Sequence, residues 1–211
     1  MAERALLDLS GLIVDENRHM RLLLRSVLGA FGLRRMREAR DGAEGLCLLR
    51  DAAPDFIITS AVMAGLNGLE FTRYVRASPG RVTPFVPVLM ISAHNDRQTL
   101  SAARDAGINE FLPKPVTPRA VLDHLTTVIK AARPFVRTDD YFGPCRRRRH
   151  GARHDGGERR GPGGAVFYSP RVEGPPSRWV WEHQGRPPLD DSGDPPRRPV
   201  NGGDNERNPV R

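Results

Sequence analysis

The sequence predicts an α/β fold, a doubly wound parallel sheet of five strands, followed by a disordered tail. Short apolar runs alternate with amphipathic segments five times between Leu9 and Lys130. Several of the runs are apolar at successive positions, which is typical of parallel strands buried on both faces. Both patterns stop at about residue 132. We therefore predict one domain over 1–132 and an Arg/Gly/Pro-rich tail over 133–211.

Local patterns define the first two strand and helix pairs. The first strand ends where an apolar run meets Asp15 and Glu16, and Asn17 is a suitable N-cap for the helix that follows. That helix carries one apolar stripe, because large apolar side chains recur at steps of three and four residues. The stripe consists of Met20, Leu23, Leu24, Val27, Leu28 and Phe31. The predicted ranges are 9–14 and 33–39 for the strands, and 42–51 for the second helix.

The remaining three pairs repeat this alternation of strand and helix. Strands are predicted over 56–59, 86–91 and 110–112, followed by helices over 67–77, 96–106 and 117–130. Open α/β sheets carry their functional groups beyond the carboxyl ends of the strands. The polar residues that fall there are Asp15, Glu16, Ser60, Ser92 and Lys114.

Four segments in register resemble the response regulator receiver domain family over about 120 residues. They are V-D-E-N from Val14, I-I-T-S-A-V-M-A-G-L-N-G-L-E around Ser60 and Gly68, V-L-M-I-S-A around Ser92, and F-L-P-K-P from Phe111. The resemblance implies the flavodoxin-like receiver fold and a role in a bacterial two-component (phosphorelay) system. It also implies a protein partner, a histidine kinase or another signalling protein, that binds around the fourth strand, the fourth helix and the fifth strand.

The resemblance assigns a role to each candidate site residue. Asp15 and Glu16 correspond to the acidic pair that helps to bind Mg²⁺, whose preferred ligands are oxygens. Lys114 corresponds to the lysine that binds the phosphoryl group, before a cis bond to Pro115. The switch residues correspond to Ser92 and Phe111. Structural interpretations of these residues remain open. Asp15 and Glu16 could be solvated loop carboxylates, and Lys114 could simply pair with one of them. Ser92 could merely end a strand, and Phe111 could be one half-buried ring of the core.

Ser60 stands where the family has its phosphorylated aspartate. A serine hydroxyl is neutral at pH 7, gives a metal no carboxylate and cannot form an acyl phosphate. No neighbour replaces it, because Asp55 is at the far end of the strand and Asn67 and Glu70 lie beyond the next loop. We therefore predict a pseudo-receiver that binds protein without phosphorylation, with Mg²⁺ binding weakened. Phosphorylation of Ser60 by a serine kinase is disfavoured, since the residue ends a buried strand.

Two other functions remain as alternatives. The chain could be a conventional phosphoaccepting regulator with an unusual acceptor. It could also bind nucleic acid through its tail, where 16 Arg against 11 acidic residues supply +5 of the net charge of +8. In that tail, 24 of 79 residues are Gly or Pro, and Trp179 and Trp181 suggest a short binding element. A solvated disordered tail is the simpler interpretation of the arginine run, so nucleic acid is not an expected partner.

Other classes of protein are not supported by the sequence. An enzyme is not predicted, because no glycine-rich phosphate loop and no Ser-His-Asp or Cys-His set is found. Cys47 and Cys145 lack the spacing of zinc ligands, and His94 is a single loop histidine near the candidate site. Without a signal peptide or a long apolar run, we expect a cytoplasmic protein with no membrane partner.

Overall fold

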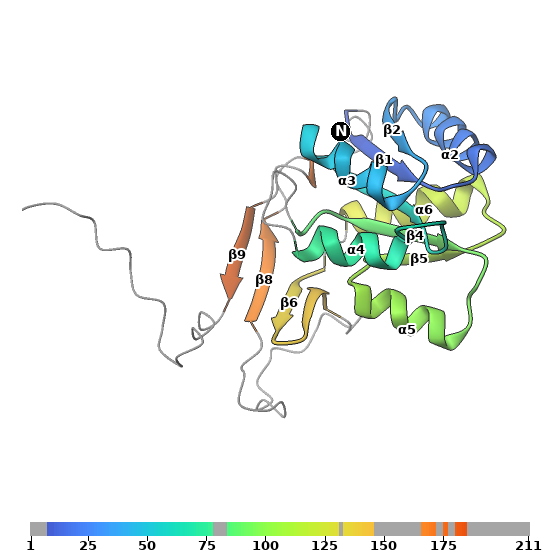
Figure 1. Cartoon of the computed structure of the whole chain (residues 1–211). Helices are drawn as coiled ribbons and strands as arrows, with labels where there is room; N and C mark the ends of the chain where they lie inside the picture. Colours follow the sequence, from blue (N-terminus) through green and yellow to red (C-terminus); the bar gives the residue numbers. More distant parts are fainter. Residues whose placement is uncertain are drawn as a thin grey trace, which may run out of the picture.

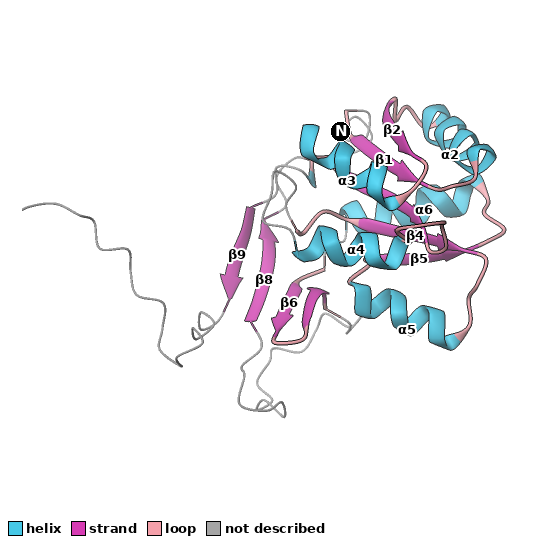
Figure 2. Ribbon diagram, viewed as in Figure 1, coloured by secondary structure: helices cyan, strands magenta, loops and turns pink. Residues whose placement is uncertain are grey.

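The computed structural model describes residues 8–77, 84–130, 133–145, 166–171, 175–176 and 180–184. These residues form two sheets, with helices on both faces of the larger one (Figures 1 and 2). The larger sheet and its helices comprise β1 (Ser10–Val14), α2 (Arg18–Ala30), β2 (Arg35–Ala39), α3 (Gly42–Asp51), β3 (Phe56–Ser60), α4 (Gly68–Ala77), β4 (Val88–Ser92), α5 (Arg97–Ala106), β5 (Glu110–Pro113) and α6 (Pro118–Lys130).

The larger sheet confirms the predicted fold class. Its five strands are parallel, in the order β2-β1-β3-β4-β5. One apolar cluster joins α2 and α6 to one face, and a second joins α3, α4 and α5 to the other. All five residues of β3 and of β4 are buried, as expected for strands covered on both sides. Strand and helix ends differ from the predicted ranges by at most two residues.

The first helix confirms its predicted cap but corrects part of its predicted stripe. Asn17 Oδ1 accepts hydrogen bonds from the backbone N–H groups of His19 and Met20, at 2.9 and 3.2 Å. Leu23 is 45% exposed and Phe31 is 40% exposed, although both were assigned to the core stripe. Leu23 lies about 100° around the helix axis from Leu24, which is buried. Phe31 is the C-cap residue, where the backbone leaves the helix.

A second, antiparallel sheet lies within the part of the chain that composition assigned to the tail. Its order is β7-β6-β8-β9, and it comprises β6 (Phe135–Thr138), β7 (Tyr141–Pro144), β8 (Val166–Arg171) and β9 (Val180–Gln184). These four strands correct the prediction of a tail that is disordered throughout 133–211. The arginine run at 146–149, Trp179 and the residues from 185 onward lie outside the described residues.

Aromatic side chains join the second sheet to the larger one. Phe85, which precedes β4, lies with its ring centroid 5.1 Å from that of Phe135, 5.2 Å from that of Phe142 and 5.4 Å from that of Tyr168. Centroid separations of this size are favourable for aromatic pairs. A Cβ added at Gly143 would lie only 2.8 Å from the Cα of Gly107, so β7 also approaches the end of α5 closely. The second sheet thus packs at the amino ends of β4 and β5.

Arg76, near the end of α4, lies at the centre of this junction and is 5% exposed. Its guanidinium carbon is 5.1 Å from the centroid of the Phe135 ring. Burial lowers the pKa of Arg76 to about 9, so the group remains positively charged at pH 7. It donates hydrogen bonds of 2.8–3.0 Å to Gly107 O, Pro84 O, Val86 O and Asn109 Oδ1. One side chain therefore ties α4 to the segments that enter β4 and β5.

Candidate functional site

The strand order brings the candidate residues to one edge of the sheet. In β1 and β3, Val14 pairs with Thr59, so Asp15 and Ser60 each follow a paired residue. Ser60 itself pairs with Ile91 in β4, one residue before Ser92. The exposed fractions of Asp15, Ser60 and Ser92 are 3%, 6% and 2%. Three buried polar residues thus lie at the ends of neighbouring strands.

Asp15 and Lys114 form an ion pair at this edge. Lys114 Nζ lies 3.4 Å from Asp15 Oδ2, and the two side chains are 24% and 4% exposed. The other oxygen of Asp15 accepts a hydrogen bond of 2.8 Å from Asn17 N. The pairing of Lys114 with Asp15 was one of the two structural possibilities that the sequence left open. The Lys114–Pro115 bond is cis, as the resemblance implied.

Glu16 is directed to a different partner. Its side chain is exposed, and Oε2 accepts a hydrogen bond of 2.7 Å from Ala64 N. Ala64 lies in the loop that follows β3, so this contact joins the loops after β1 and β3. The two acidic residues that were predicted to act together therefore each have their own protein partner.

The Ser60 side chain points its hydroxyl to the loop after β3. Oγ donates a hydrogen bond of 3.0 Å to the carbonyl oxygen of Val62. The backbone around Ser60 is crowded, because a Cβ added at Gly68 would overlap the Ser60 carbonyl oxygen. Only glycine lets the first turn of α4 approach the end of β3 this closely. This contact gives a structural reason for Gly68 in the segment around Ser60.

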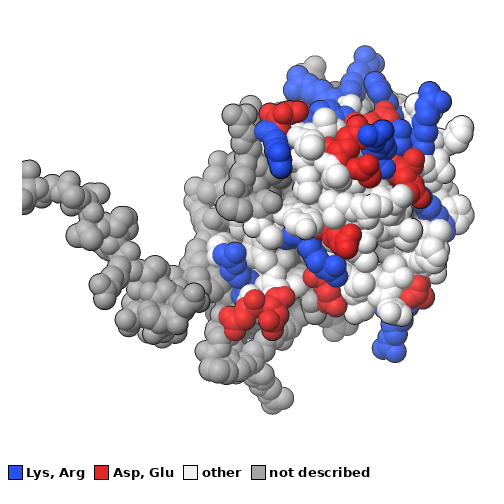
Figure 3. All heavy atoms as spheres, viewed as in Figure 1, with Lys and Arg blue, Asp and Glu red and all other residues white. Residues whose placement is uncertain are grey.

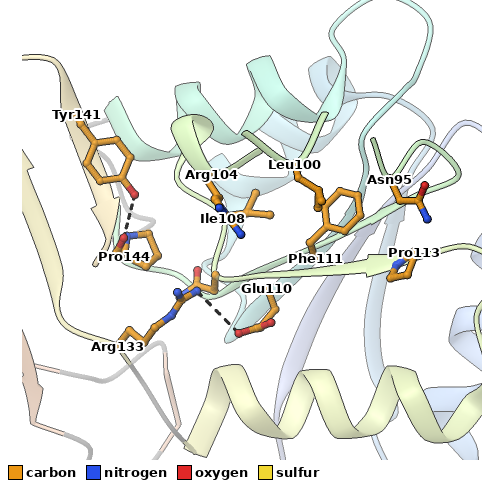
Figure 4. A pocket seen from close by; sticks show the side chains of 11 residues that line it. Asn95, Leu100, Arg104, Ile108, Glu110, Phe111, Pro113, Arg133, Tyr141 and Pro144 are labelled. Atoms are coloured by element: carbon orange, nitrogen blue, oxygen red, sulfur yellow. Dashed lines mark hydrogen bonds and ion pairs between the residues drawn. The ribbon is translucent and has the colours of Figure 1, made fainter. Parts of the chain in front are cut away.

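Ser92 and Phe111 lie on adjacent strands. Ser92 Oγ accepts a hydrogen bond of 3.0 Å from His94 N, while Ser92 O accepts one of 2.7 Å from Lys114 N. His94 thus reaches the site through its backbone, and its side chain is exposed. Phe111 is half-buried against the core cluster of α3, α4 and α5, and it also lines a hollow beside α5 (Figure 4).

The residues at this edge do not fit a resident Mg²⁺ ion. Three of the oxygens that could bind it are already engaged, with Lys114, Asn17 and Ala64. Ser60 adds a neutral hydroxyl in place of a third carboxylate. Among the residues that the structure describes, no group of three or more His, Cys, Asp or Glu side chains is placed to hold a metal. Mg²⁺ is usually bound by one or two carboxylates whose oxygens are free to coordinate it, together with waters and phosphate oxygens.

The carboxylates on either side of β3 and its following loop, Asp55 and Glu70, have structural roles. Asp55 Oδ2 accepts hydrogen bonds of 2.7 and 2.9 Å from the backbone N and the Oγ of Ser10, at the amino end of the sheet. Glu70 Oε2 accepts a hydrogen bond of 3.3 Å from Asn67 N at the start of α4. Each of the two carboxylates thus has a backbone partner away from the Ser60 hydroxyl, which donates to Val62 O.

Charged side chains of both signs are intermixed on the face shown in Figure 3. Several arginines of the larger sheet and its helices are paired with acids. Arg21 and Arg25 lie 3.3 and 3.1 Å from Glu38, and Arg40 lies 3.5 Å from Glu44. This mixture is unlike the one-sided basic surface typical of nucleic-acid-binding domains.

Loss of the Asp15–Lys114 ion pair should measurably lower the free energy of unfolding. In Lys114→Met the buried carboxylate loses its cation, so we expect the free energy of unfolding at pH 7 to fall by about 2 kcal/mol. In Asp15→Asn/Lys114→Met the loss should be smaller than the sum of the two single losses. Urea unfolding of the four proteins gives this coupling energy. Additive losses would mean that the two groups do not interact in solution.

Comparison with known proteins identifies relatives for the larger sheet and its helices. Residues 12–126 match the family model described as response regulator receiver domain. Chemotaxis protein CheY-3 of Vibrio cholerae serotype O1 is 31% identical over 119 residues, which cover 56% of this chain and 90% of CheY-3. Chemotaxis protein CheY of Pseudomonas aeruginosa is also 31% identical over 119 residues, covering 56% of this chain and 94% of CheY.

A solved structure is also similar to this part of the chain. Chemotaxis response regulator CheY4 of Vibrio cholerae superposes with a TM-score of 0.53 and 28% identity, covering 57% of this chain and 98% of CheY4. The family match ends at residue 126, before β6, so it does not include the second sheet. Within the described residues, no helix is long and apolar enough to cross a membrane.

Proposed function

Because the chain belongs to the response regulator receiver domain family, we propose that it is a two-component signalling protein that binds a partner without being phosphorylated. The observation that carries this proposal is Ser60 at the end of β3, with its hydroxyl donated to Val62 O. An aspartate at this position would supply both the phosphoryl acceptor and a metal ligand. A hydroxyl supplies neither at pH 7.

The contacts around Ser60 support one fixed arrangement of the edge. Lys114 is held by Asp15, Glu16 is held by Ala64 N, and Ser60 is held by Val62 O. With each of these groups satisfied by a partner within the protein, the edge keeps its geometry without a metal or a phosphoryl group. The partner would then recognise a surface whose shape does not depend on phosphorylation, and the chain would act as a binding module rather than as an enzyme.

The experiment compares amide NMR spectra of the full chain before and after addition of MgCl₂ and acetyl phosphate. For the wild type we expect unchanged resonances for Ser92, Phe111 and Lys114, because the Ser60 hydroxyl cannot form an acyl phosphate and gives Mg²⁺ no carboxylate. Ser60→Asp serves as the matched control, and its resonances should shift once the carboxylate is restored. A shift of the same resonances in the wild type would contradict this proposal and support the alternative, a conventional phosphoaccepting regulator.

A further inference from the structure

Helix α4 connects two places that lie far apart in the fold. It begins at Gly68, beside Ser60 at the carboxyl end of β3, and its other end lies beside the second sheet (Figure 1). At 1.5 Å per residue, its 10 residues span about 15 Å. The second sheet begins after residue 126, where the family match ends, so the family resemblance implies nothing about this connection.

The first end of α4 leaves no room for movement toward β3. Gly68 N donates a hydrogen bond of 3.1 Å to Ala61 O, and a Cβ added at Gly68 would overlap the Ser60 carbonyl oxygen. Thr72 Oγ1 donates a hydrogen bond of 2.7 Å to Gly68 O, which ties the first turn of the helix to the next. Any displacement of the start of α4 therefore changes its contact with the backbone of Ser60.

The body of α4 is tightly packed between these two ends. Phe71 and Val75 are 0% and 2% exposed, within the cluster that joins α3, α4 and α5 to the larger sheet. A Cβ added at Gly45 of α3 would lie 3.0 Å from the Phe71 ring, so the two helices approach closely. Close-packed elements shift as units and do not deform continuously. A displacement at one end of α4 should therefore reach the other end.

The second end of α4 is held by both sheets. Arg76 donates hydrogen bonds to the segments that enter β4 and β5, and its guanidinium carbon lies 5.1 Å from the centroid of the Phe135 ring. The Phe135 ring also lies 5.1 Å from that of Phe85 and 5.6 Å from that of Phe142, between centroids. Loss of the Phe135 ring should therefore loosen the second sheet and the end of α4 together.

We infer that the second sheet is a regulatory element of this chain, which sets the position of α4 and, through α4, the geometry of the sheet edge at Ser60. A partner that binds or loosens the second sheet would then change that edge. By linkage, a change at the edge alters the docking of the second sheet by the same free energy. This inference goes beyond the proposed function, and it holds whether or not Ser60 is phosphorylated.

The test is a double-mutant cycle on the full chain that combines Gly68→Ala with Phe135→Leu. Gly68→Ala pushes the start of α4 away from Ser60, and a helix that is held at its other end cannot follow. Phe135→Leu removes the ring but keeps an apolar side chain. We expect the factor by which Gly68→Ala lowers the equilibrium constant for folding to be about tenfold smaller in the Phe135→Leu background than in the wild type. Urea unfolding of the four proteins measures both factors.

Gly11→Ala is the matched control for crowding that does not involve α4. Gly11 lies in β1 of the same sheet, and a Cβ added there would lie 2.5 Å from Cζ of Phe56 and 2.7 Å from Sδ of Met36. Its effect on the equilibrium constant for folding should agree within about twofold in the wild-type and Phe135→Leu backgrounds, because uncoupled sites give additive losses of free energy.

Amide hydrogen exchange of Phe135→Leu alone decides the question if Gly68→Ala does not fold. Gly68 N donates to Ala61 O at 3.1 Å, and Leu33 N, after α2, donates to Leu28 O at 3.0 Å. A lower global stability speeds the exchange of both amides by the same factor, whereas local loosening does not. Relative to the wild type, we expect exchange at Gly68 to accelerate about tenfold more than exchange at Leu33.

Three results would overturn the inference. They are additive losses from Gly68→Ala and Phe135→Leu, equal non-additivity for the Gly11→Ala control, or equal acceleration of exchange at Gly68 and Leu33. Neither experiment contains acetyl phosphate or MgCl₂, so its failure would leave the proposed function intact. Conversely, a wild type that is phosphorylated by acetyl phosphate would overturn the proposed function and leave the coupling through α4 intact.

Discussion

Arg76→Met should lower the free energy of unfolding by about 3 kcal/mol, because buried acceptors that lose a donor cost about 1–3 kcal/mol each and removal of a buried charge offsets part of this. The variant leaves Gly107 O, Pro84 O and Val86 O without the guanidinium donor. It also removes the cation over the Phe135 ring. Urea unfolding followed by far-UV circular dichroism measures the loss, which should include the second sheet.

Arg73→Met is the control for this prediction. Arg73 lies on the same helix, is exposed, and forms no ion pair or hydrogen bond that involves its side chain among the described residues. Its replacement should change the free energy of unfolding by less than about 0.5 kcal/mol. Equal stabilities of the Arg76 and Arg73 variants would mean that Arg76 does not hold the two sheets together.

Gly68→Ala should be the most damaging single-methyl change in the domain, with an expected loss of about 3 kcal/mol from forced overpacking. The added Cβ would overlap the Ser60 carbonyl oxygen and lie 3.0 Å from Thr59 Oγ1. The atoms it meets include backbone at the end of β3, which cannot rotate away as a side chain can. The start of α4 must therefore move, and the hydrogen bond of 3.1 Å from Gly68 N to Ala61 O is weakened.

A change of the same type elsewhere should have the opposite sign. Gly29 lies in α2, and a Cβ added there would have no atom within 4 Å. Gly29→Ala should stabilise the protein by about 0.5–1 kcal/mol, because alanine loses less backbone entropy in a helix than glycine does. Thermal unfolding of the two variants side by side tests the prediction. A Gly68→Ala variant with the melting temperature of the wild type would contradict the prediction, because it would show that the end of β3 accommodates the added methyl group at little cost in free energy.

Much of the larger sheet could be predicted from the sequence, because the signals are local. The apolar runs correctly predicted β3 and β4, and the presence of a suitable N-cap residue at Asn17 correctly predicted the start of α2. The parallel order then placed Asp15, Ser60, Ser92 and Lys114 at one edge. The Asp15–Lys114 pair was foreseen only as one of two options, since the choice between Asp15 and Glu16 depends on loop geometry.

The junction with the second sheet could not be predicted from local patterns. Arg76 resembles any charged residue in the last turn of a helix, and only the fold brings four acceptors around it. The strands of the second sheet are short and lie in a stretch rich in Gly, Pro and Arg, so the composition of that stretch suggested disorder. Their stabilising contacts are long-range, as between Phe85 and Phe135 or Tyr168. A cluster of Phe and Tyr after residue 132 was the available signal.

The most direct test of the central proposal is the intact mass of the purified full chain after incubation with acetyl phosphate and MgCl₂, beside Ser60→Asp treated in the same way. Ser60→Asp establishes that the remaining edge residues can support phosphoryl transfer. We expect the wild-type mass to stay unchanged and the variant to gain one phosphoryl group. A phosphorylated wild type, with the group mapped to Ser60 or to a neighbouring carboxylate, would contradict phosphorylation-independent signalling.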